Sequence, residues 1–309
     1  MQDIVSVITT FYNDENYILK CINSVNCQLV NNQFKIEYIL VNDCSEDSSQ
    51  EIVNIYFNKK SNENVTIKII NTVENLGCGG ARNFGISNSS GKYLMFLDAD
   101  DYYIKNDFIL RAYNIITEND ADIVEFGIKY INANGEHENI VSKNNLLIQN
   151  SKENNLCAMF NEALIKFMPW TKIIKRDIVN TRKYNTSRTY EDIRTTPYWV
   201  YNANKIIIAN TVEINYRNKL NSIIRKNDNE TRYGTVLAIS ELFEDFKDNK
   251  KIIKAFYDRC LIDLRTIIGL NSNDEYFKKM SKLNTYMLSY IYPNTYKEIT
   301  FDIEDLEQD

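Results

Sequence analysis

Three carboxylates follow the most apolar short segment of the chain, and their spacing could serve cation binding. Residues 93–97 (Tyr-Leu-Met-Phe-Leu) run directly into Asp98, Asp100 and Asp101. A short run of β-favouring apolar residues predicts a strand buried on both faces of a parallel sheet. Ligands collect at the carboxyl ends of such strands, so we expect Asp98 and Asp100 in a crevice. There they can bind one Mg²⁺ or Mn²⁺ that bridges to substrate phosphates.

The same acidic segment has a simpler interpretation. Asp is a preferred helix N-cap and favours the positive end of the helix dipole, so the cluster can also be a solvated turn or a cap. Short motifs of this kind occur by chance. On these residues alone both interpretations stay open.

Polar side chains also follow the three other predicted strands. Thr10 and Tyr12 follow the first strand, Asp43 follows the second, and a glycine-rich segment with Arg82 follows the third. The ring of Tyr12 can stack a base while Asp43 accepts from its imide N–H, although Tyr12 can equally be a packing residue. Arg82 carries a planar, permanent charge that suits phosphate.

The glycine-rich segment permits two interpretations. Gly77, Gly79 and Gly80 let the backbone approach a ligand closely, and a helix that begins near Ala81 would direct free N–H groups toward an anion. Alternatively the segment is a flexible connection. It is neither a Rossmann fingerprint nor a Walker A loop, because the required spacing and the Lys-Ser/Thr pair are missing.

Alternating strands and helices must position these residues. The sequence predicts strands over 4–10, 37–41, 65–70 and 93–97. Apolar residues at helical spacing predict helices over 18–25 and 52–56. This alternation predicts an α/β fold with a doubly wound, mostly parallel central sheet flanked by helices.

The composition is that of an ordinary globular protein. The chain has 309 residues, 44% hydrophobic and 25% charged, enough for one large domain or one domain with an appendage. Met1-Gln2-Asp3 begins no basic signal segment, and no apolar run approaches the roughly 20 residues that span a bilayer, so we expect a cytoplasmic location. The six cysteines are scattered without a C-x-x-C pair, which predicts free thiols.

Charge and histidine content exclude two further classes of function. A net charge of −6 argues against nucleic-acid binding, which needs a basic surface. The single histidine, His137, lies in a polar segment typical of a hairpin or loop tip and is not expected to be catalytic.

Five segments together resemble the motifs of family 2 glycosyltransferases with the GT-A fold. They are V-S-V-I-T-T-F-Y-N-D at 5–14, V-N-D-C-S-E-D-S at 41–48, N-L-G-C-G-G-A-R-N-F-G at 75–85, Y-L-M-F-L-D-A-D-D at 93–101 and Y-E-D-I at 190–193. The resemblance covers about residues 4–225 and implies an inverting, hexosyltransferase-type enzyme of bacterial surface-polysaccharide synthesis, such as capsule or lipopolysaccharide. Thr10, Asn42 and Cys44 depart from the commonest pattern, which leaves the base preference open.

The resemblance implies a role for each matching residue. The residues that it implies bind substrate are Thr10, Tyr12, Asp14, Asp43, Arg82, Asp98 and Glu191. Within this set Tyr12 stacks the base, Asp43 binds the uracil edge and Arg82 lies by the nucleotide and diphosphate. Asp100 is the principal ligand of a Mn²⁺ or Mg²⁺ cofactor, and Asp98 contacts the ribose or the metal. The implied donor is a UDP-sugar and the implied acceptor is a saccharide or a lipid-linked saccharide.

Asp192 is implied as the catalytic base. An acceptor hydroxyl that attacks an anomeric carbon must lose its proton, and a positioned carboxylate can take it. Glu191 beside it could raise the pKa of Asp192 or bind an acceptor hydroxyl. The alternative is that the Glu191-Asp192 pair caps the next helix.

The chain is expected to divide near residue 217. Residues 1–217 would form the catalytic domain, with a nucleotide-sugar half (1–103) and an acceptor half (104–217), followed by a helical region (218–300) and an acidic tail (301–309). Between Lys247 and Lys282 nine basic side chains outnumber five acidic ones. Such a face can contact an anionic membrane, or it can pack on the catalytic domain or on a second subunit, which would make a homo-oligomer.

Two other functions would require sequence features that can be compared with this chain. A nucleotidyltransferase that makes sugar nucleotides should have a glycine-rich loop with Lys or Arg after the first strand, whereas residues 11–15 are acidic and lack glycine. A non-catalytic nucleotide-sugar-binding protein would tolerate the loss of Asp100 or Asp192, and both are present.

Overall fold

The structure is a computed structural model that describes residues 2–59, 62–131, 137–141, 146–148, 151–161, 164–186, 189–217, 228–268, 275–293 and 295. The expected acidic tail and the expected boundary at 217/218 reach outside these residues. By their contacts the residues form two compact units. The first is Met1–Asn150 with Met168–Lys219, and the second is Ser151–Phe167 with Leu220–Asp309.

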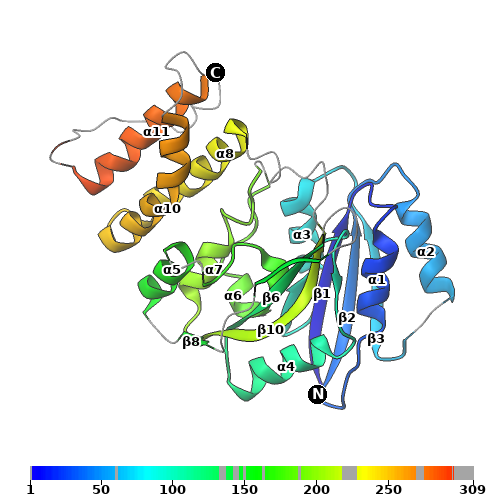
Figure 1. The fold of residues 1–309 in the computed structure, drawn as a ribbon. Coiled ribbons are helices and arrows are strands. Elements are labelled where there is room, and N and C mark those ends of the chain that lie inside the picture. Colours follow the sequence, from blue (N-terminus) through cyan, green and yellow to red (C-terminus); the bar gives the residue numbers. More distant parts are fainter. Residues whose placement is uncertain are drawn as a thin grey trace. The chain divides into compact units, whose positions relative to one another are not determined.

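The first unit contains a mixed, mostly parallel sheet, drawn in Figure 1. Its strands are β1 (Asp3–Phe11), β2 (Phe34–Asn42), β3 (Val65–Asn71), β4 (Tyr93–Phe96), β5 (Tyr102–Tyr103), β6 (Ile123–Ile131), β7 (His137–Val141), β8 (Leu146–Ile148), β9 (Lys172–Lys175) and β10 (Ile206–Arg217). The order is β3-β2-β1-β4-β9-β6-β10-β5, with β7 paired to β6 and β8 paired to β10.

Helices flank this sheet and make up the second unit. They are α1 (Ile18–Asn26), α2 (Ser49–Lys59), α3 (Gly77–Ser87), α4 (Phe108–Glu118), α5 (Lys152–Phe160), α6 (Arg176–Val179), α7 (Thr196–Asn202), α8 (Asn229–Ser240), α9 (Leu242–Phe246), α10 (Lys250–Ile268) and α11 (Glu275–Ile291), with a 3₁₀ turn at Pro169–Thr171. The predicted fold class is therefore confirmed, helical C-terminal region included.

The four strands predicted in the first hundred residues pair in parallel. In register, Val5 of β1 lies between Ile36 of β2 and Tyr93 of β4. The middle of β1 and all of β4 are buried, which explains their continuous apolar runs. Because these strands are parallel, the residues that follow them all lie at one edge of the sheet. The later strand β9 runs antiparallel to both β4 and β6.

Helix α3 corrects the prediction for the glycine-rich segment. The helix begins at Gly77 rather than near Ala81, so Gly79 and Gly80 lie inside it. Gly77 makes the entering turn with φ +69°, a conformation that favours glycine. The turn is fixed because the Asn75 side chain accepts a hydrogen bond from the Gly77 N–H. The segment is neither a loop nor a flexible connection.

A glycine also determines how closely α3 packs on the sheet. The helix lies against β1 and β2. A Cβ atom at Gly85 would lie 2.5 Å from Cγ2 of Ile8 and 3.2 Å from Cγ2 of Val41. Only glycine lets the helix approach these strands so closely, and this approach brings its first turns to the edge where the strands end.

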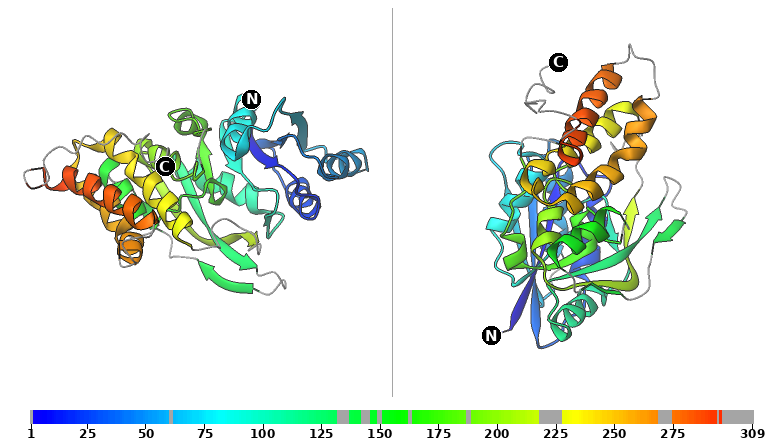
Figure 2. Two further views of the ribbon diagram at one scale, coloured as in Figure 1. Left: turned by 90° about the horizontal axis from the view of Figure 1, so that it is seen from above. Right: turned by 90° about the vertical axis from the view of Figure 1, so that its left-hand side faces the viewer.

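The second unit is a helical cluster. Helices α8, α10 and α11 pack on one another, as both views in Figure 2 show. Phe256 of α10 lies in contact with the rings of Phe160, Phe243 and Phe246. Because Phe160 belongs to α5, residues 151–167 cluster with the C-terminal helices, although the sequence places them in the acceptor half.

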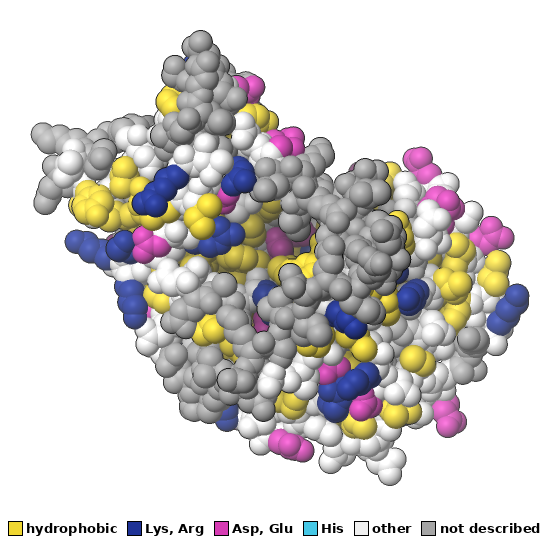
Figure 3. Space-filling model, viewed as in Figure 1, with side chains coloured by type: hydrophobic (Ala, Val, Ile, Leu, Met, Phe, Trp, Pro, Cys, Tyr) yellow, Lys and Arg dark blue, Asp and Glu magenta, His cyan; other side chains and the backbone are white. Residues whose placement is uncertain are grey.

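Several smaller observations bear on the expectations from sequence. All six cysteines are free thiols. His137 begins β7, which pairs antiparallel with β6, as in a hairpin. No helix among the described residues combines the length and the apolar character that crossing a bilayer requires. Lys and Arg side chains are spread among Asp and Glu over the face drawn in Figure 3.

We predict that Gly85→Ala destabilises the protein. The added Cβ overpacks the contact with Ile8, and the cost exceeds the helix propensity that alanine gains, for a net loss of about 1–2 kcal/mol. Urea unfolding measures this difference. Ser87→Ala, an exposed position on the same helix, is the control and should change stability by less than about 0.5 kcal/mol. Equal stability of Gly85→Ala and the wild type would contradict the packing argument.

Candidate active site

The carboxylates that follow β4 converge. Single oxygen atoms of Asp98, Asp100 and Asp101 all lie within 4.8 Å of one another. Asp98 and Asp100 are half-buried and Asp101 is buried. Oxygen donors at this density suit a hard divalent cation such as Mg²⁺ or Mn²⁺, since a cation would relieve their mutual repulsion. The donor set therefore fits the metal expected from the sequence.

Asp101 was noted in the sequence but not predicted as a ligand. Alternation along a strand would direct Asp101 away from Asp98 and Asp100. The strand has already ended, however, and the backbone turns so that the Asp101 N–H donates to the Asp98 carbonyl at 3.0 Å. Arg217, at the end of β10, holds this turn by donating its backbone N–H to the Asp101 carboxylate and its Nε–H to the Asp100 carbonyl. No sequence signal identified Arg217.

Arg82 joins the acidic cluster to a distant turn. Its guanidinium donates to Asp98 Oδ1 at 2.8 Å and to Glu191 Oε1 at 2.6 Å. The Arg82 side chain is buried, and its charge lies 5.4 Å from the ring centroid of Tyr184. The sequence predicted Arg82 beside the diphosphate, and the structure adds that two carboxylates hold it in place.

The Glu191 turn packs directly against α3. A Cβ atom at Gly79 would lie 2.5 Å from the Asn185 carbonyl oxygen and 3.3 Å from Cβ of Glu191. Asn83, one helical turn further, accepts from the Tyr184 N–H and donates to the Tyr184 carbonyl. Gly79 therefore matters for close packing, a role that the sequence analysis did not foresee.

The environment of Asp192 raises the pKa of its carboxyl group, which bears on its role as a base. Its side chain is half-buried, and Oδ1 accepts from the Ile193 N–H at 2.8 Å. Burial and the charge of Glu191 raise the pKa of Asp192 to about 6, although the charge of Arg82 opposes them. A carboxylate with this pKa is ionised at neutral pH and is a stronger base than an ordinary aspartate.

The helix-cap alternative for this pair does not describe the geometry. Helix α7 begins at Thr196, and its N-cap is Thr195, which makes no side-chain cap bond. The backbone carbonyl of Asp192 accepts from Thr195 and Thr196, but its carboxylate is bonded to the adjacent N–H of Ile193. The carboxylate is thus not an N-cap of α7.

The predicted base-pocket residues lie where β1 and β2 end. Tyr12 is 46% exposed and Thr10 is half-buried. The carboxylate of Asp14 accepts from the Tyr12 N–H at 3.2 Å. Asp43 is buried, and its Oδ1 accepts from Thr72 Oγ1 and the Leu76 N–H, both at 2.9 Å. Asp43 therefore also fixes the start of α3.

The loop that follows β1 and the loop that follows β2 are linked by two hydrogen bonds in opposite directions. The Asn13 N–H donates to Ser45 Oγ, and the Asn13 side chain accepts from the Glu46 N–H. Asn13 has φ +56°, a left-handed conformation that Asn tolerates. The structure thus forms two groups of predicted residues at one sheet edge: Thr10, Tyr12, Asp14 and Asp43 in the first, and Arg82, Asp98, Asp100, Glu191 and Asp192 in the second.

A carboxylate cluster, a buried arginine and a carboxylate with a raised pKa at the carboxyl edge of this sheet define a transferase of the GT-A type. Residues 6–184, more than half of the chain, match the family model described as Glycosyl transferase family 2. The chain therefore belongs to glycosyl transferase family 2 and is a glycosyltransferase.

Similar proteins agree with this assignment. Glycosyltransferase GlyG of Streptococcus pneumoniae is 26% identical over 73% of this chain and 74% of its own length. Glycosyltransferase GlyA of the same organism is 30% identical over 78% of this chain but only 34% of its own length. The poly(ribitol-phosphate) beta-glucosyltransferase of Bacillus spizizenii is 38% identical over 46% of this chain and 22% of its own length. The chain thus spans only about a third and about a fifth of the length of the last two relatives.

Solved structures share the fold. Residues 1–349 of TarS from S. aureus superpose with a TM-score of 0.67 at 22% identity, covering 94% of this chain and 81% of TarS 1–349. The same protein in complex with UDP-GlcNAc gives a TM-score of 0.60 at 19% identity, covering 98% of this chain and 94% of that one. At these identities the likeness establishes the GT-A fold alone.

We predict that Asp192→Asn stabilises the protein above pH 6. The folded-state pKa of Asp192 lies above the unfolded value, so the folded state holds an unfavourable charge at neutral pH and none well below the unfolded pKa. The substitution should raise the free energy of unfolding by about 1–2 kcal/mol at neutral pH, and the gain should shrink to a small fraction of this near pH 4. Denaturant unfolding at both pH values measures it, with exposed Asp177→Asn as the control. A loss of stability at neutral pH would contradict the raised pKa.

Proposed function

We propose that this glycosyltransferase transfers a sugar from a UDP-sugar to a saccharide or lipid-linked saccharide, with inversion and with the help of Mn²⁺ or Mg²⁺. The observation that carries the proposal is that Arg82 forms ion pairs with two carboxylates from distant parts of the chain. One buried side chain binds both Asp98 of the carboxylate cluster and Glu191, the neighbour of Asp192. Leaving-group and acceptor functions would therefore share one site.

The residues perform a single displacement. The acceptor oxygen forms a bond to the anomeric carbon while the bond from that carbon to the diphosphate oxygen breaks, and UDP leaves with the electron pair. Asp192 takes the acceptor proton. Asp100, Asp98 and Asp101 would hold the cation, whose charge stabilises the departing diphosphate. Attack from the face opposite to the diphosphate inverts the anomeric centre.

The residues proposed to bind the nucleotide are chosen for their positions at the ends of β1 and β2. Tyr12, exposed at the end of β1, would stack the base, with Thr10 and Asp14 beside it and Asp43 on the uracil edge. TarS structures in complex with UDP and with UDP-GlcNAc, and the Pyrobaculum calidifontis mannosyltransferase in complex with GDP-Man and Mn²⁺, support a nucleotide-sugar donor and a divalent cation. Family membership decides against the nucleotidyltransferase alternative.

The biological setting is proposed from the relatives. Their names include a poly(ribitol-phosphate) glucosyltransferase and a minor teichoic acid biosynthesis protein, which supports cell-surface polysaccharide synthesis. We place the enzyme in the cytoplasm, in peripheral contact with the membrane. The basic excess between Lys247 and Lys282 supports this contact.

We predict metal-dependent turnover of one donor from a panel of UDP-sugars, measured as UDP release. Asp100→Ala should lose turnover because the cation loses a ligand. Asp192→Asn should lose turnover by a factor of about 100 or more while it still binds UDP, since only proton transfer is removed. If UDP-sugars bind and both variants behave like the wild type with candidate acceptors present, the protein is a non-catalytic binder and the proposal fails.

We also predict how Glu191→Gln changes the fall of kcat at low pH. Turnover requires ionised Asp192, so kcat should fall by half near pH 6 as the pH is lowered. Glu191→Gln removes a neighbouring negative charge, which lowers the pKa of Asp192 and moves this fall to lower pH. The profile of kcat against pH measures this, with Asp177→Asn as the matched control. A fall that does not move, or moves upward, would show that Glu191 does not act on the base.

A further inference from the structure

A cavity lies along helix α3, on a different side of the helix from the carboxylates of the candidate active site. It is a groove of about 560 Å³, a size that holds a ligand well beyond a single phosphate. We call it the α3–α6 groove. Residues on its two sides include Leu76, Gly80, Phe84, Arg176, Val179 and Lys183.

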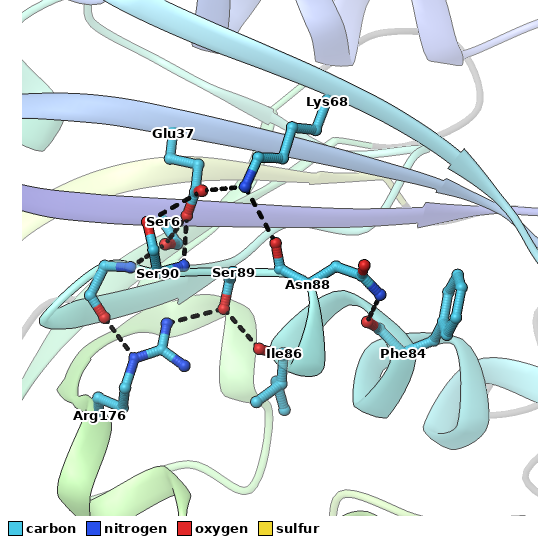
Figure 4. Close-up of polar contacts among 10 residues, drawn as sticks. Ser6, Glu37, Lys68, Phe84, Ile86, Asn88, Ser89, Ser90 and Arg176 are labelled. Atoms are coloured by element: carbon cyan, nitrogen blue, oxygen red, sulfur yellow. Dashed lines mark hydrogen bonds and ion pairs between the residues drawn. The ribbon is translucent and has the colours of Figure 1, made fainter.

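The groove is cationic within a chain that is acidic overall. Arg176 and Lys183 line it, and no Asp or Glu is among the described residues that do. Burial lowers the pKa of Arg176, and the charges of Glu37 and Asp177 oppose this, although neither carboxylate forms an ion pair with Arg176. As Figure 4 shows, Glu37 is engaged elsewhere, by Lys68 and by the hydroxyls of Ser6 and Ser90.

Arg176 is held in place but keeps donor capacity. Its Nε–H donates to the Gly91 carbonyl, and Nη2 donates to Ser89 Oγ, as Figure 4 shows. Among the described residues, Nη1 has no acceptor. Lys183 is exposed and forms no ion pair with any residue of the described ranges. A positioned guanidinium with free N–H groups is a partner for phosphate or carboxylate.

The remaining lining narrows the class of ligand. Leu76, Phe84 and Val179 give the groove apolar walls, against which the C–H faces of sugars or polyols can pack. Asn180 and Thr186 add an amide and a hydroxyl that can bond to ligand hydroxyl groups. Cations, apolar walls and hydroxyl partners together favour a hydroxyl-rich anionic chain over an acyl chain.

One end of the groove adjoins the active site through α3, and Arg176 lies toward the other end, where its Nε–H donates to the Gly91 carbonyl ahead of β4. Gly80 lines it, whereas its neighbour Gly79 packs against the segment that contains Asn185 and Glu191. A chain bound in the groove therefore lies beside the helix that carries Arg82. We propose, on the basis of the proposed function, that the α3–α6 groove binds a phosphodiester-linked polyol or sugar chain as the acceptor, with Arg176 and Lys183 on its phosphates.

The test is direct binding of a short synthetic ribitol phosphate oligomer, followed by fluorescence anisotropy. Lys183→Glu should weaken binding about tenfold, the loss of one charge-assisted hydrogen bond. Arg176→Gln should weaken it similarly. Lys35→Glu, the same charge change at an exposed position of β2, is the matched control and should bind like the wild type. UDP affinity and unfolding are measured on every variant, so a folding defect is recognised.

Several outcomes would overturn the inference. Unchanged affinity in Lys183→Glu, or equal weakening in Lys35→Glu, would show that the groove is not the binding site. Equal binding of a neutral oligosaccharide of matched length would remove the role of phosphate. Binding of phosphatidylglycerol vesicles without binding of the oligomer would assign the groove to lipid. If the oligomer binds in the groove but no UDP-sugar is turned over with it, the proposed function and the acceptor role both fail, and only the assignment of the groove as a binding site stands.

Discussion

The buried charge of Arg82 is the constraint on which the candidate site depends. A guanidinium removed from water needs carboxylate partners, and here the partners come from the end of β4 and from a turn 109 residues away. Removing Arg82 would leave the carboxylates of Asp98 and Glu191 without the cation they share, at a cost of about 3–5 kcal/mol. The position of the acidic cluster and that of the Glu191-Asp192 turn are therefore linked.

Helix α3 makes this link possible because glycine occupies two of its faces. At Gly85 the helix approaches Ile8 and Val41 of the sheet, and at Gly79 the turn with Glu191 approaches the helix. Each glycine costs roughly 1 kcal/mol of helix stability compared with alanine. Close packing on both sides offsets this cost and brings Arg82 within reach of both carboxylates.

Local patterns were sufficient to predict the strands and the acidic edge. Runs of apolar, β-favouring residues marked β1 to β4, and the carboxyl-edge rule predicted the location of Asp98 and Asp100. Contacts between distant residues were not predictable in the same way. The pairing of Arg82 with Glu191 follows from tertiary packing, which no spacing encodes, and α5 joins the C-terminal helices through the ring of Phe160 on Phe256. Asp101 was missed because a turn, rather than strand alternation, directs its side chain.

The ion pair also separates the roles of two adjacent carboxylates. Glu191 is held by Arg82 at 2.6 Å. That fixed charge acts in turn on Asp192, which is bonded to a single backbone N–H and has a raised pKa. A carboxylate held in an ion pair and a neighbouring carboxylate with a raised pKa can divide the work of binding and proton transfer. The same arginine that positions the turn also opposes, through its own charge, the rise in the pKa of Asp192 that burial and Glu191 cause, so it acts on both the structure and the acid–base chemistry of this site.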